Sequence, residues 1–398
     1  MFYFSSFTIY LLFKFMKKIK RIVIFTLFLD MLGMTIMIPA FPNLVTYYHT
    51  SYFMISLGVT LFSLFGLFST PILWAISDKY GRKIVLLVSV ISSLISYWLI
   101  RISGNIRVYL ISRIVNGAAA GNISSIQSIL TDISVDHKER TANFWLFGAV
   151  FGLWFIIGPA IGGWLLWYGV KMPFIVSFFL CLINVLFIIR WLPETNKFLA
   201  TTKKISINIV SIFKNMFVSK ENKEYLVFFI VNLALMVYQM SFVLFLNERF
   251  GISGETSGYV MALIGLVMVI NQWFLLKSFW LKRFSNKRLV WISILWMIVC
   301  YAWAFFAGSL RIIIALVAIS GVFQWIFRPV FQDMILWNNH DIGLINGNMA
   351  ALANLANIFW PLVGGYMIDL NISPFGLVVV LLIVAYIYAK KYLTRQIA

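Results

Sequence analysis

Three charged residues lie inside long apolar segments of this sequence, where ionised side chains are rare. Asp30 falls near the middle of the apolar segment 21–45, and Arg113 and Arg328 fall in two later segments. A charge at the centre of a bilayer costs roughly 3 kcal/mol or more, so it must be paired, hydrated or neutralised. Burial favours the protonated carboxyl group, which makes Asp30 the predicted proton-coupling residue. The alternative for Asp30 is a structural hydrogen bond.

Arg113 keeps its charge in any protein environment and therefore needs a partner or a water-filled cavity. Asp30 is the predicted acidic partner, and Asp132 is a second acid on the same segment as Arg113. Pairing with backbone carbonyl groups, in a purely structural role, remains the alternative for this arginine.

Arg328 belongs to a polar stripe, because Gln324, Arg328 and Gln332 recur every four residues and share one helical face. Pro329 removes a backbone donor beside the stripe and predicts a kink. A guanidinium group in a cavity suits a cargo that carries a carboxylate or phosphate. Alternatively, Arg328 extends its charge toward the cytoplasmic face.

Further amide side chains fall in other apolar segments of the second half of the chain. Amides in membrane helices act either as contacts between helices or as the lining of a cavity. Their concentration favours a polar substrate cavity in the second half. The predicted cavity residues, besides Arg328 and Gln324, are Asn232, Gln239, Gln272, Asn346, Asn354 and Asn357.

The composition identifies an all-α membrane protein. Hydrophobic residues make up 62% of the chain and charged residues 11%, with a mean hydropathy of +0.93. A bilayer-spanning helix needs about 20 mostly apolar residues. β-Barrel strands would alternate apolar and polar residues, and these segments do not. Twelve spans are predicted, at 21–45, 52–74, 84–103, 108–131, 143–167, 171–192, 225–246, 256–277, 288–307, 311–336, 343–369 and 373–390.

The net charge of +19 orients the helices. With both termini in the cytoplasm, most of the 32 Lys and Arg residues fall on the cytoplasmic side, as the positive-inside rule requires. The basic residues are therefore expected to contact anionic membrane lipid, not nucleic acid. The predicted location is the bacterial cytoplasmic (inner) membrane, and the protein is expected to function as a monomer.

One long polar interval divides the predicted spans into six and six. Residues 1–15 are apolar but too short to span a bilayer, so they are either an interfacial segment or precede a natural start at Met16. The predicted division is an N-terminal cytoplasmic or interfacial segment 1–20, a six-helix bundle 21–192, a cytoplasmic linker 193–224, a second six-helix bundle 225–390 and a cytoplasmic tail 391–398.

The sequence does not indicate an enzyme. The loops are too short to hold a catalytic domain, and the chain has no nucleotide-binding glycine loop, so ATP is not the expected energy source. Both cysteines lie in apolar segments and the three histidines are scattered, which predicts neither disulfides nor a metal site. We expect no cofactor, with a proton gradient as the energy source.

Two stretches of the chain repeat at a nearly constant distance. Pro159 in Gly-Pro-Ala-Ile-Gly-Gly corresponds to Pro361 in Trp-Pro-Leu-Val-Gly-Gly, 202 positions later. The basic loop 78–83 corresponds to the loop 282–287, 204 positions later. Two similar membrane halves are typical of a transporter with parallel repeats, whose substrate site lies between the halves.

Four motifs resemble those of the major facilitator superfamily, and in particular its drug/proton antiporters such as the bacterial tetracycline exporters. They are Asp78-Lys79-Tyr80-Gly81-Arg82-Lys83, Arg113-x-x-x-Gly117, the glycine motif Gly148, Gly152, Gly158-Pro159 and Gly162-Gly163, and Asp30-x-x-Gly33 followed by Pro39-Ala40-Phe41-Pro42. The resemblance implies twelve helices in two six-helix bundles. It also implies conformational gating by Asp78, Gly81, Arg82, Lys83 and the glycine motif, and an influence of Arg113 on proton movement.

The chain departs from this pattern at several positions. Trp74 stands where the family loop begins with glycine, which affects how closely the helices approach there. Ser96, Met268 and Met297 stand where tetracycline exporters carry ionisable residues inside the membrane. Of those groups only the counterpart of Asp30 remains, so tetracycline itself is not the expected cargo.

The predicted function is proton-coupled efflux of an amphipathic small organic molecule by alternating access. Because Arg113 and Arg328 give the interior a positive bias, a cargo that can carry an anionic group is favoured over a lipophilic cation. One alternative is a proton-coupled importer of a small organic anion, and another is a membrane sensor or assembly partner that transports nothing.

Overall fold

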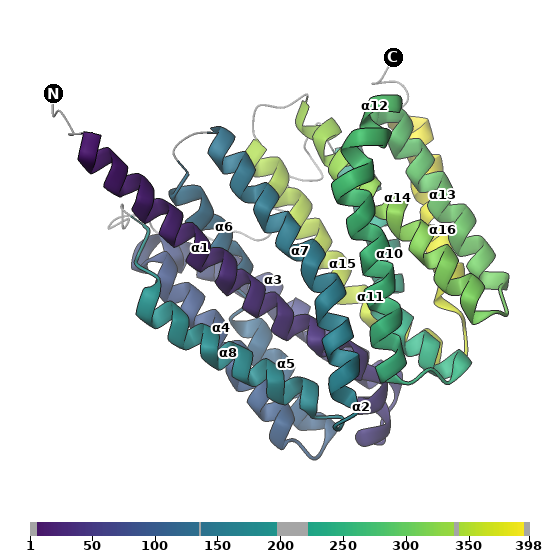
Figure 1. The fold of residues 1–398 in the computed structure, drawn as a ribbon. Coiled ribbons are helices and arrows are strands. Elements are labelled where there is room, and N and C mark those ends of the chain that lie inside the picture. The colour runs from purple at the N-terminus through teal and green to yellow at the C-terminus, as the bar shows by residue number, and fades with distance from the viewer. Residues whose placement is uncertain (1–5, 135–136, 197–221, 338–341, 394–398) are drawn as a thin grey trace.

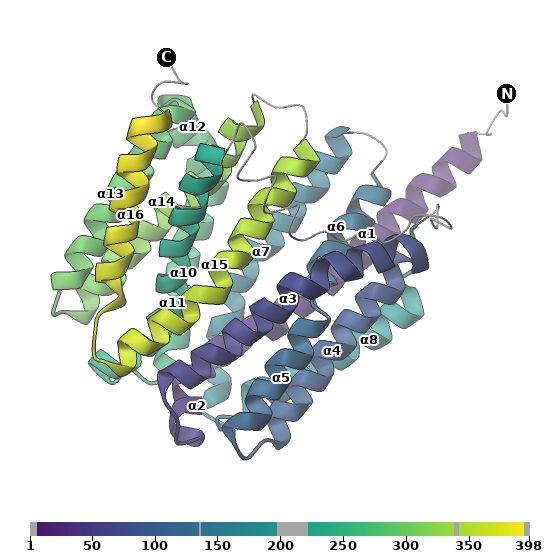
Figure 2. The same ribbon diagram turned by 180° about the vertical axis from the view of Figure 1, so that it is seen from behind.

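The computed structural model describes residues 6–134, 137–196, 222–337 and 342–393, and the regular elements within these ranges are helices (Figures 1 and 2). The first group comprises α1 (Ser6–Ile36), the 3-10 helix η1 (Ile38–Ala40), α2 (Phe41–Tyr47), α3 (Tyr52–Tyr80), α4 (Arg82–Ile102), α5 (Ile106–Ala118), α6 (Asn122–Asp132), α7 (His137–Leu166) and α8 (Met172–Trp191). The second comprises α10 (Asn222–Phe250), α11 (Gly254–Ile270), the π-helix η2 (Asn271–Trp280), α12 (Leu281–Arg283), α13 (Asn286–Phe306), α14 (Leu310–Trp337), α15 (Ile342–Asp369) and α16 (Pro374–Leu393).

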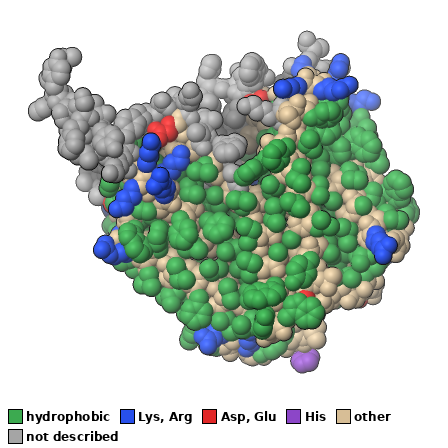
Figure 3. All heavy atoms as spheres, viewed as in Figure 1, with side chains coloured by type: hydrophobic (Ala, Val, Ile, Leu, Met, Phe, Trp, Pro, Cys, Tyr) green, Lys and Arg blue, Asp and Glu red, His purple; other side chains and the backbone are tan. Residues whose placement is uncertain are grey.

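Each of the twelve predicted spans coincides with a helix or with consecutive helices, which confirms the predicted fold class. Eight helices in the described ranges are long and apolar enough to cross a membrane, and a bent pair within α10 makes nine. Hydrophobic side chains cover the middle of the face in Figure 3, with Lys and Arg near its margins. That arrangement fits a protein whose middle is surrounded by lipid.

The helices form two packed groups that meet along two pairs. Within the first group, α1 packs on α7 and α8, and α4 packs on α5 and α8. Within the second, α13 packs on α14 and α16, and α10 packs on α15 and α16. The groups meet where α7 packs on α11 and α3 packs on α15 (Figures 1 and 2). The predicted boundaries at 193–224 stay a prediction, because 197–221 lies outside the described residues.

The first helix is longer than predicted. The predicted span began at residue 21, whereas α1 is continuous from Ser6, and its first turns extend beyond the neighbouring helices in Figure 1. The apolar run before the basic residues 17–21 has no helix-breaking Pro or Gly, so the helix continues through it.

Two departures from regular α-helix were not predicted. The span 108–131 is interrupted at residues 119–121, between α5 and α6. The break leaves backbone carbonyl groups without their helical hydrogen bonds, and hydroxyl groups of α3 donate to them. The Ser69 hydroxyl donates to the Gly117 carbonyl at 2.7 Å, and the Thr70 hydroxyl donates to the Ala120 carbonyl at 2.9 Å. The span 256–277 changes from α-helix to π-helix at Asn271.

The two groups are joined by hydrogen bonds at the end that the charge distribution predicts to be outside. The Asn43 amide donates to the Glu255 carboxylate at 3.3 Å, and the Tyr52 hydroxyl donates to Asn247 at 2.9 Å. The Asp369 carboxylate, at the end of α15, accepts the backbone N–H groups of Tyr52 and Phe53 at 2.9 Å each. A carboxylate at the beginning of α3 also interacts favourably with the helix dipole. This end of the molecule is therefore closed.

Close contact between α7 and α11 depends on glycine at positions 163 and 258. A Cβ atom on Gly258 would overlap the Pro159 carbonyl oxygen and the backbone of Gly163. A Cβ atom on Gly163 would lie 2.5 Å from the Glu255 carbonyl oxygen. The two backbones touch here without intervening side chains, which is how small residues promote helix association in membranes.

We predict that Gly258→Val lowers the free energy of unfolding by about 1–3 kcal/mol, since added atoms must separate two touching backbones. The measurement is the thermal unfolding midpoint of the purified protein in detergent. Gly104→Val is the matched control, because no atom lies within 4 Å of a Cβ at Gly104. Equal destabilisation by both variants would contradict the close contact.

Candidate functional site

Asp30 lies buried on α1 beside a polar cavity in the first group of helices. Its side chain is 4% exposed, and its carboxylate accepts a hydrogen bond from the amide of Asn122. The adjoining cavity holds about 410 Å³, counting the part open to solvent. Its lining includes Asp30, Asn122, Met34, Met37, Phe62, Ser89, Ser93, Tyr97 and Asn116. An acid in this position can exchange a proton through the cavity.

The predicted ion pair between Asp30 and Arg113 does not form. Arg113 is 3% exposed, and its guanidinium donates to the Ser96 hydroxyl at 2.8 Å and to the Met37 sulfur at 3.4 Å. The guanidinium carbon lies 5.9 Å from the ring centroid of Tyr97 and 5.7 Å from that of Tyr109. These rings offer the cation their negative faces.

The helix break between α5 and α6 explains this separation. Asn122 is the first residue of α6, so the break brings its side chain and the positive end of a half-helix to Asp30. Asp132, the other predicted partner of Arg113, lies at the opposite end of α6 and pairs with Arg82. Within the described ranges, no carboxylate lies within ion-pair distance of Arg113. The arginine is stabilised by hydroxyl groups and rings.

Ser96, Met268 and Met297, which stand where tetracycline exporters carry ionisable residues, lie in three different parts of the structure. Ser96 is the direct hydrogen-bond partner of Arg113. Met268 lines a small cavity between the two groups of helices, and Met297 is fully buried in the core of the second group. The acceptor for Arg113 is therefore a neutral hydroxyl group.

Arg328 faces the interior of the bundle and is nevertheless exposed. On α14, Ile312 and Ile319 are 46% and 45% exposed and mark the lipid-facing side. At 3.6 residues per turn, Arg328 lies about 160° around the helix from Ile312. The Arg328 side chain is therefore exposed on the side of α14 opposite these two isoleucines. Gln324, one turn earlier, is 8% exposed, and its side-chain oxygen has no hydrogen-bond partner.

The other predicted cavity amides do not behave alike. Asn354 is exposed and Asn357 is half-buried on α15, with Asn354 about 140° around the helix from the exposed Phe359. Gln239 and Gln272 are half-buried. Asn232 is buried and donates to the Phe228 carbonyl of its own helix at 2.8 Å. That bond is a structural contact. The Asn346 side chain lies outside the described residues.

The glycine motif of α7 lies along two helices. Cβ atoms at Gly158 and Gly162 would overlap Thr35 and the Ile36 carbonyl of α1. Two other glycines of the motif face α11: Gly152 lies against Val269, and Gly163 lies against the Glu255 backbone. Pro159 is buried within α7. Gly148 also belongs to α7, and its surroundings lie outside the description. The motif thus lets α7 approach both α1 and α11.

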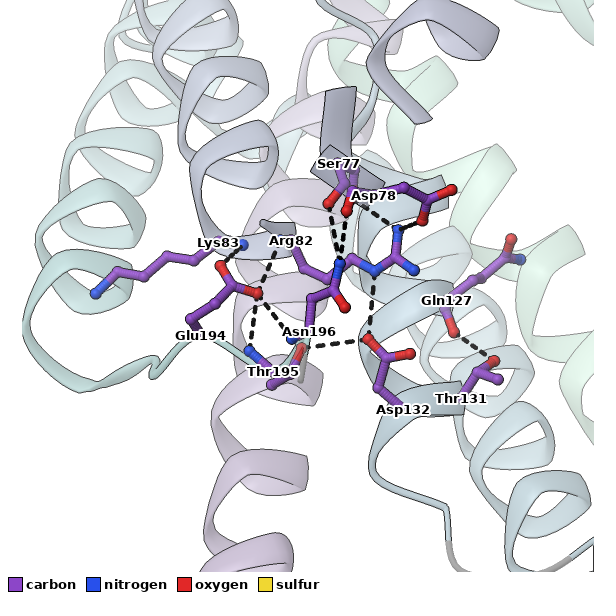
Figure 4. Close-up of polar contacts among 10 residues, drawn as sticks. All are labelled: Ser77, Asp78, Arg82, Lys83, Gln127, Thr131, Asp132, Glu194, Thr195 and Asn196. Atoms are coloured by element: carbon purple, nitrogen blue, oxygen red, sulfur yellow. Dashed lines mark hydrogen bonds and ion pairs between the residues drawn. The ribbon is translucent and has the colours of Figure 1, made fainter. Parts of the chain in front are cut away.

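The loop between α3 and α4 forms a compact polar cluster (Figure 4). Arg82 forms ion pairs with Asp78 at 2.6 Å and with Asp132 at 3.3 Å, and it donates to the Ser77 hydroxyl at 3.0 Å. Gly81 has φ of 109°, a conformation that side chains disfavour. The Lys83 ammonium donates to the Ile189 carbonyl at 3.0 Å. The cluster joins α3, α4, α6 and α8 at one end of the first group.

Comparison with known proteins decides the family. The family model of the Major Facilitator Superfamily matches residues 23–277, more than half of the chain. The chain belongs to the Major Facilitator Superfamily.

The similar proteins cover nearly the whole chain. Multidrug resistance protein 2 of Bacillus subtilis (strain 168) is 23% identical over 90% of this chain and 91% of that protein. The class H tetracycline resistance protein of Pasteurella multocida is 26% identical over 94% of this chain and 98% of that protein. A bacterial homologue of the human lysosomal transporter Spinster, solved inward-facing and unoccupied, superposes with a TM-score of 0.74 at 12% identity, covering 96% and 98% of the two chains. The twelve-helix fold is thereby shown.

Membership of this superfamily makes the protein a multi-pass membrane transporter of a small molecule. The members of this superfamily are in general not enzymes.

Sequence reasoning missed Glu194, which organises the superfamily loop. Its carboxylate accepts the backbone N–H groups of Arg82 and Lys83 at 2.9 and 3.1 Å, at the beginning of α4. It also accepts those of Thr195 and Asn196 at 2.9 Å each. The sequence offered one sign of this role, since Glu194 is an acid that directly follows the apolar span 171–192. The prediction places Glu194 in the cytoplasmic linker 193–224 instead.

Asp132 closes the same cluster from α6. Its carboxylate accepts from Arg82 and, at 3.5 Å, from the Thr195 hydroxyl. Burial raises the pKa of this carboxyl group above its usual value, and the neighbouring Arg82 guanidinium offsets part of that rise. The second half has a related contact, in which the Asn286 amide donates to the Asp333 carboxylate at 2.9 Å. Asp132 and Asp333 differ by 201 positions, in agreement with the repeat found in the sequence.

We predict that Glu194→Gln destabilises the protein by about 0.5–2 kcal/mol, the range measured for loss of a helix N-cap. The neutral amide keeps the size of the side chain but presents its NH₂ group to backbone donors. Thermal unfolding in detergent measures the change. Lys79→Gln removes a charge from the same loop without touching these four bonds, and it should leave the midpoint unchanged. A midpoint of Glu194→Gln equal to wild type would contradict this role.

Proposed function

We propose that this transporter exports an amphipathic organic molecule in exchange for protons, by alternating access. The observation that carries the proposal is Asp30, a buried carboxyl group on a polar cavity, held by a neutral amide and by no cation among the described residues. Relatives named multidrug and tetracycline resistance proteins support the outward direction. The energy source is the proton gradient, with no bound cofactor.

Asp30 couples the proton to the change of conformation through its charge. When ionised, the carboxylate needs the Asn122 amide and water in the cavity, which keeps the cavity open. When protonated, it is neutral and tolerates closure around it. Alternation of these two states lets a proton enter from one side and leave on the other. Arg113, held by Ser96 and two rings, keeps a constant positive charge beside the path.

The contacts between the groups of helices supply a gate at one end of the molecule. The α3–α15 and α7–α11 pairs close one end of the molecule, where Asp369 and Glu255 bridge the groups. Opening this end requires these bonds to break, and the α3–α4 cluster lies at the opposite end of α3. We place the closed end outside, with both termini in the cytoplasm and the protein in the bacterial inner membrane as a monomer surrounded by lipid.

The proposed cargo is amphipathic and can carry an anionic group. Arg328 is an exposed cation on the side of α14 opposite the exposed Ile312 and Ile319, and Arg113 adds a second positive charge. Asn354 and Gln272 provide hydrogen-bonding groups in the same half of the chain. An interior with two cations that form no ion pair with a carboxylate of the described residues repels lipophilic cations. The contrary direction, proton-coupled import of a small organic anion, would use the same groups, so the direction must be measured.

Asp30→Asn is predicted to abolish cargo accumulation against its gradient in proteoliposomes with an imposed pH gradient, because the amide cannot take up a proton. Exchange of cargo without a gradient should persist. Thr26→Val is the matched control, since the Thr26 hydroxyl is buried on the same helix without a hydrogen-bond partner. Cargo that moves together with protons would support import instead, and coupled flux that survives Asp30→Asn would place coupling elsewhere.

Arg328→Gln is predicted to reduce export of acidic amphipathic compounds about tenfold or more, since a hydrogen bond to a charged group contributes roughly 1.5–3 kcal/mol. A growth screen in an export-deficient bacterial strain measures resistance. Arg311→Gln, at the exposed beginning of the same helix, is the control. Strong resistance to ethidium that Arg328→Gln leaves unchanged would overturn the proposed preference for anions.

A further inference from the structure

A pocket at the closed end of the second group of helices is separate from the Asp30 cavity. It holds about 410 Å³, counting the part open to solvent, and about 130 Å³ of this space can take the centre of a water molecule. One water needs roughly 10–15 Å³ on that measure, so the pocket has room for a polar group of several non-hydrogen atoms. The lining consists of Phe245, Glu248 and Arg249 of α10, Ile368 of α15, and Asn371, Ile372 and Ser373 of the connection to α16.

Two opposite charges line this one space without pairing with each other. Glu248 and Arg249 are neighbours on α10, and adjacent helical residues point about 100° apart. Both are exposed, and neither forms an ion pair with another residue of the described ranges. The Arg249 guanidinium carbon lies 5.9 Å from the ring centroid of the buried Phe245, and the Glu248 carboxylate lies beside the neutral Tyr52 hydroxyl. The pocket thus presents an anion and a cation that are both available to a ligand.

A hydroxyl group without a partner completes the polar lining. The Ser373 oxygen is shielded from solvent and makes no hydrogen bond. A polar group buried in this way is unfavourable until a ligand supplies its partner. Because a hydroxyl can donate to a phosphate oxygen, Ser373 adds to the anion-binding capacity of Arg249.

The two helix ends that form the walls are fixed by their own hydrogen bonds. At the end of α10, Gly251 has φ of 63° and its N–H group donates to the Asn247 carbonyl at 2.9 Å. At the end of α15, Asn371 has φ of 58° and its N–H group donates to the Ile368 carbonyl at 2.9 Å. Residues in this left-handed conformation commonly end helices. Walls that are already ordered reduce the entropic cost of binding a ligand.

The pocket lies at the level of the predicted outer membrane surface. Its charged residues directly follow the predicted span 225–246, and Asn371 lies between the last two predicted spans. Figure 2 shows the ends of α10 and α15 and the connection to α16 together at the lower left of the molecule. Leu370 and Ile372 are 52% and 48% exposed beside the polar groups. This combination of exposed apolar and charged groups fits the boundary between lipid headgroups and acyl chains.

We propose that this pocket binds an ammonium–phosphate zwitterion, the chemistry of an aminoethyl phosphate group. The phosphate pairs with Arg249 and accepts from Ser373, and the ammonium group donates to Glu248. An anion alone would leave Glu248 unpaired and be repelled by it, and a cation alone would be repelled by Arg249. The proposal goes beyond export, because it concerns a site outside the Asp30 cavity and holds for any cargo.

This chemistry has two sources, a phospholipid of the outer leaflet and soluble phosphoethanolamine. Native mass spectrometry of the full-length protein in detergent, without cargo or gradient, measures binding. The probes are dioleoyl phosphatidylethanolamine, phosphatidylcholine and phosphatidylglycerol, which share their acyl chains. Wild type should prefer phosphatidylethanolamine about tenfold or more, because choline has no N–H donor and glycerol has no positive charge.

The two charges should contribute in different ways. Glu248→Gln should lower the affinity for phosphatidylethanolamine to that for phosphatidylcholine, since it removes the partner of the ammonium group. Arg249→Gln should weaken both lipids about tenfold, since both carry the phosphate. Arg249→Lys keeps the positive charge and should retain most of the binding. Arg107→Gln is the matched control, because Arg107 is an exposed cation at the beginning of α5 in the other group of helices.

Free phosphoethanolamine at about 10 mM distinguishes the two sources. Displacement of the lipid would assign the site to the soluble zwitterion, and no displacement would assign it to the lipid headgroup; both results support the paired charges. Equal affinity of wild type for the three lipids would overturn the proposal. So would affinity for phosphatidylethanolamine that neither Glu248→Gln nor Arg249→Gln changes, in variants whose circular dichroism and elution match wild type.

Discussion

The membrane interior offers no water to satisfy a charge or a backbone group, and the arrangement of this transporter follows from that constraint. Arg113 keeps its charge because a hydroxyl group and two tyrosine rings surround it. Asp30 is held by one amide beside a cavity, so its charge depends on whether that cavity is wet. The permanent cation is enclosed, and the group that can lose its charge borders the cavity. This division suits an acid that must exchange protons during transport.

The same constraint explains why irregular helices occur only with compensating partners. The break between α5 and α6 frees carbonyl groups, which the Ser69 and Thr70 hydroxyls of α3 satisfy. The π-helix η2 is fastened to α14 by Asn271. Both irregular segments place side chains at cavities, Asn122 in the first half and Gln272 in the second. Departures from local regularity tend to fall at functional sites, and in this protein they lie on both sides of the proposed path.

Contact between the halves depends on small residues and on a few charged ends. Gly163 and Gly258 allow the backbones of α7 and α11 to touch, while Asp369 accepts the first N–H groups of α3. Hydrogen bonds at helix ends can be exchanged without disturbing the apolar faces of the helices. A transporter that alternates between two closures needs interfaces of this kind, because each must be stable and yet separable.

The sequence by itself determined the number and approximate positions of the apolar spans, the repeat and the family motifs, because hydrophobic length, charge asymmetry and motif spacing are local or periodic properties. It also identified Asp30, Arg113 and Arg328 as costly charges that need an explanation. Only the tertiary structure decided their partners: Asp30 with Asn122, Arg113 with Ser96, and Asp132 with Arg82. The helix break, the π-helix and the capping role of Glu194 were likewise invisible. Each arises from contacts between segments distant in sequence, and hydrophobic periodicity carries no information about which segments meet.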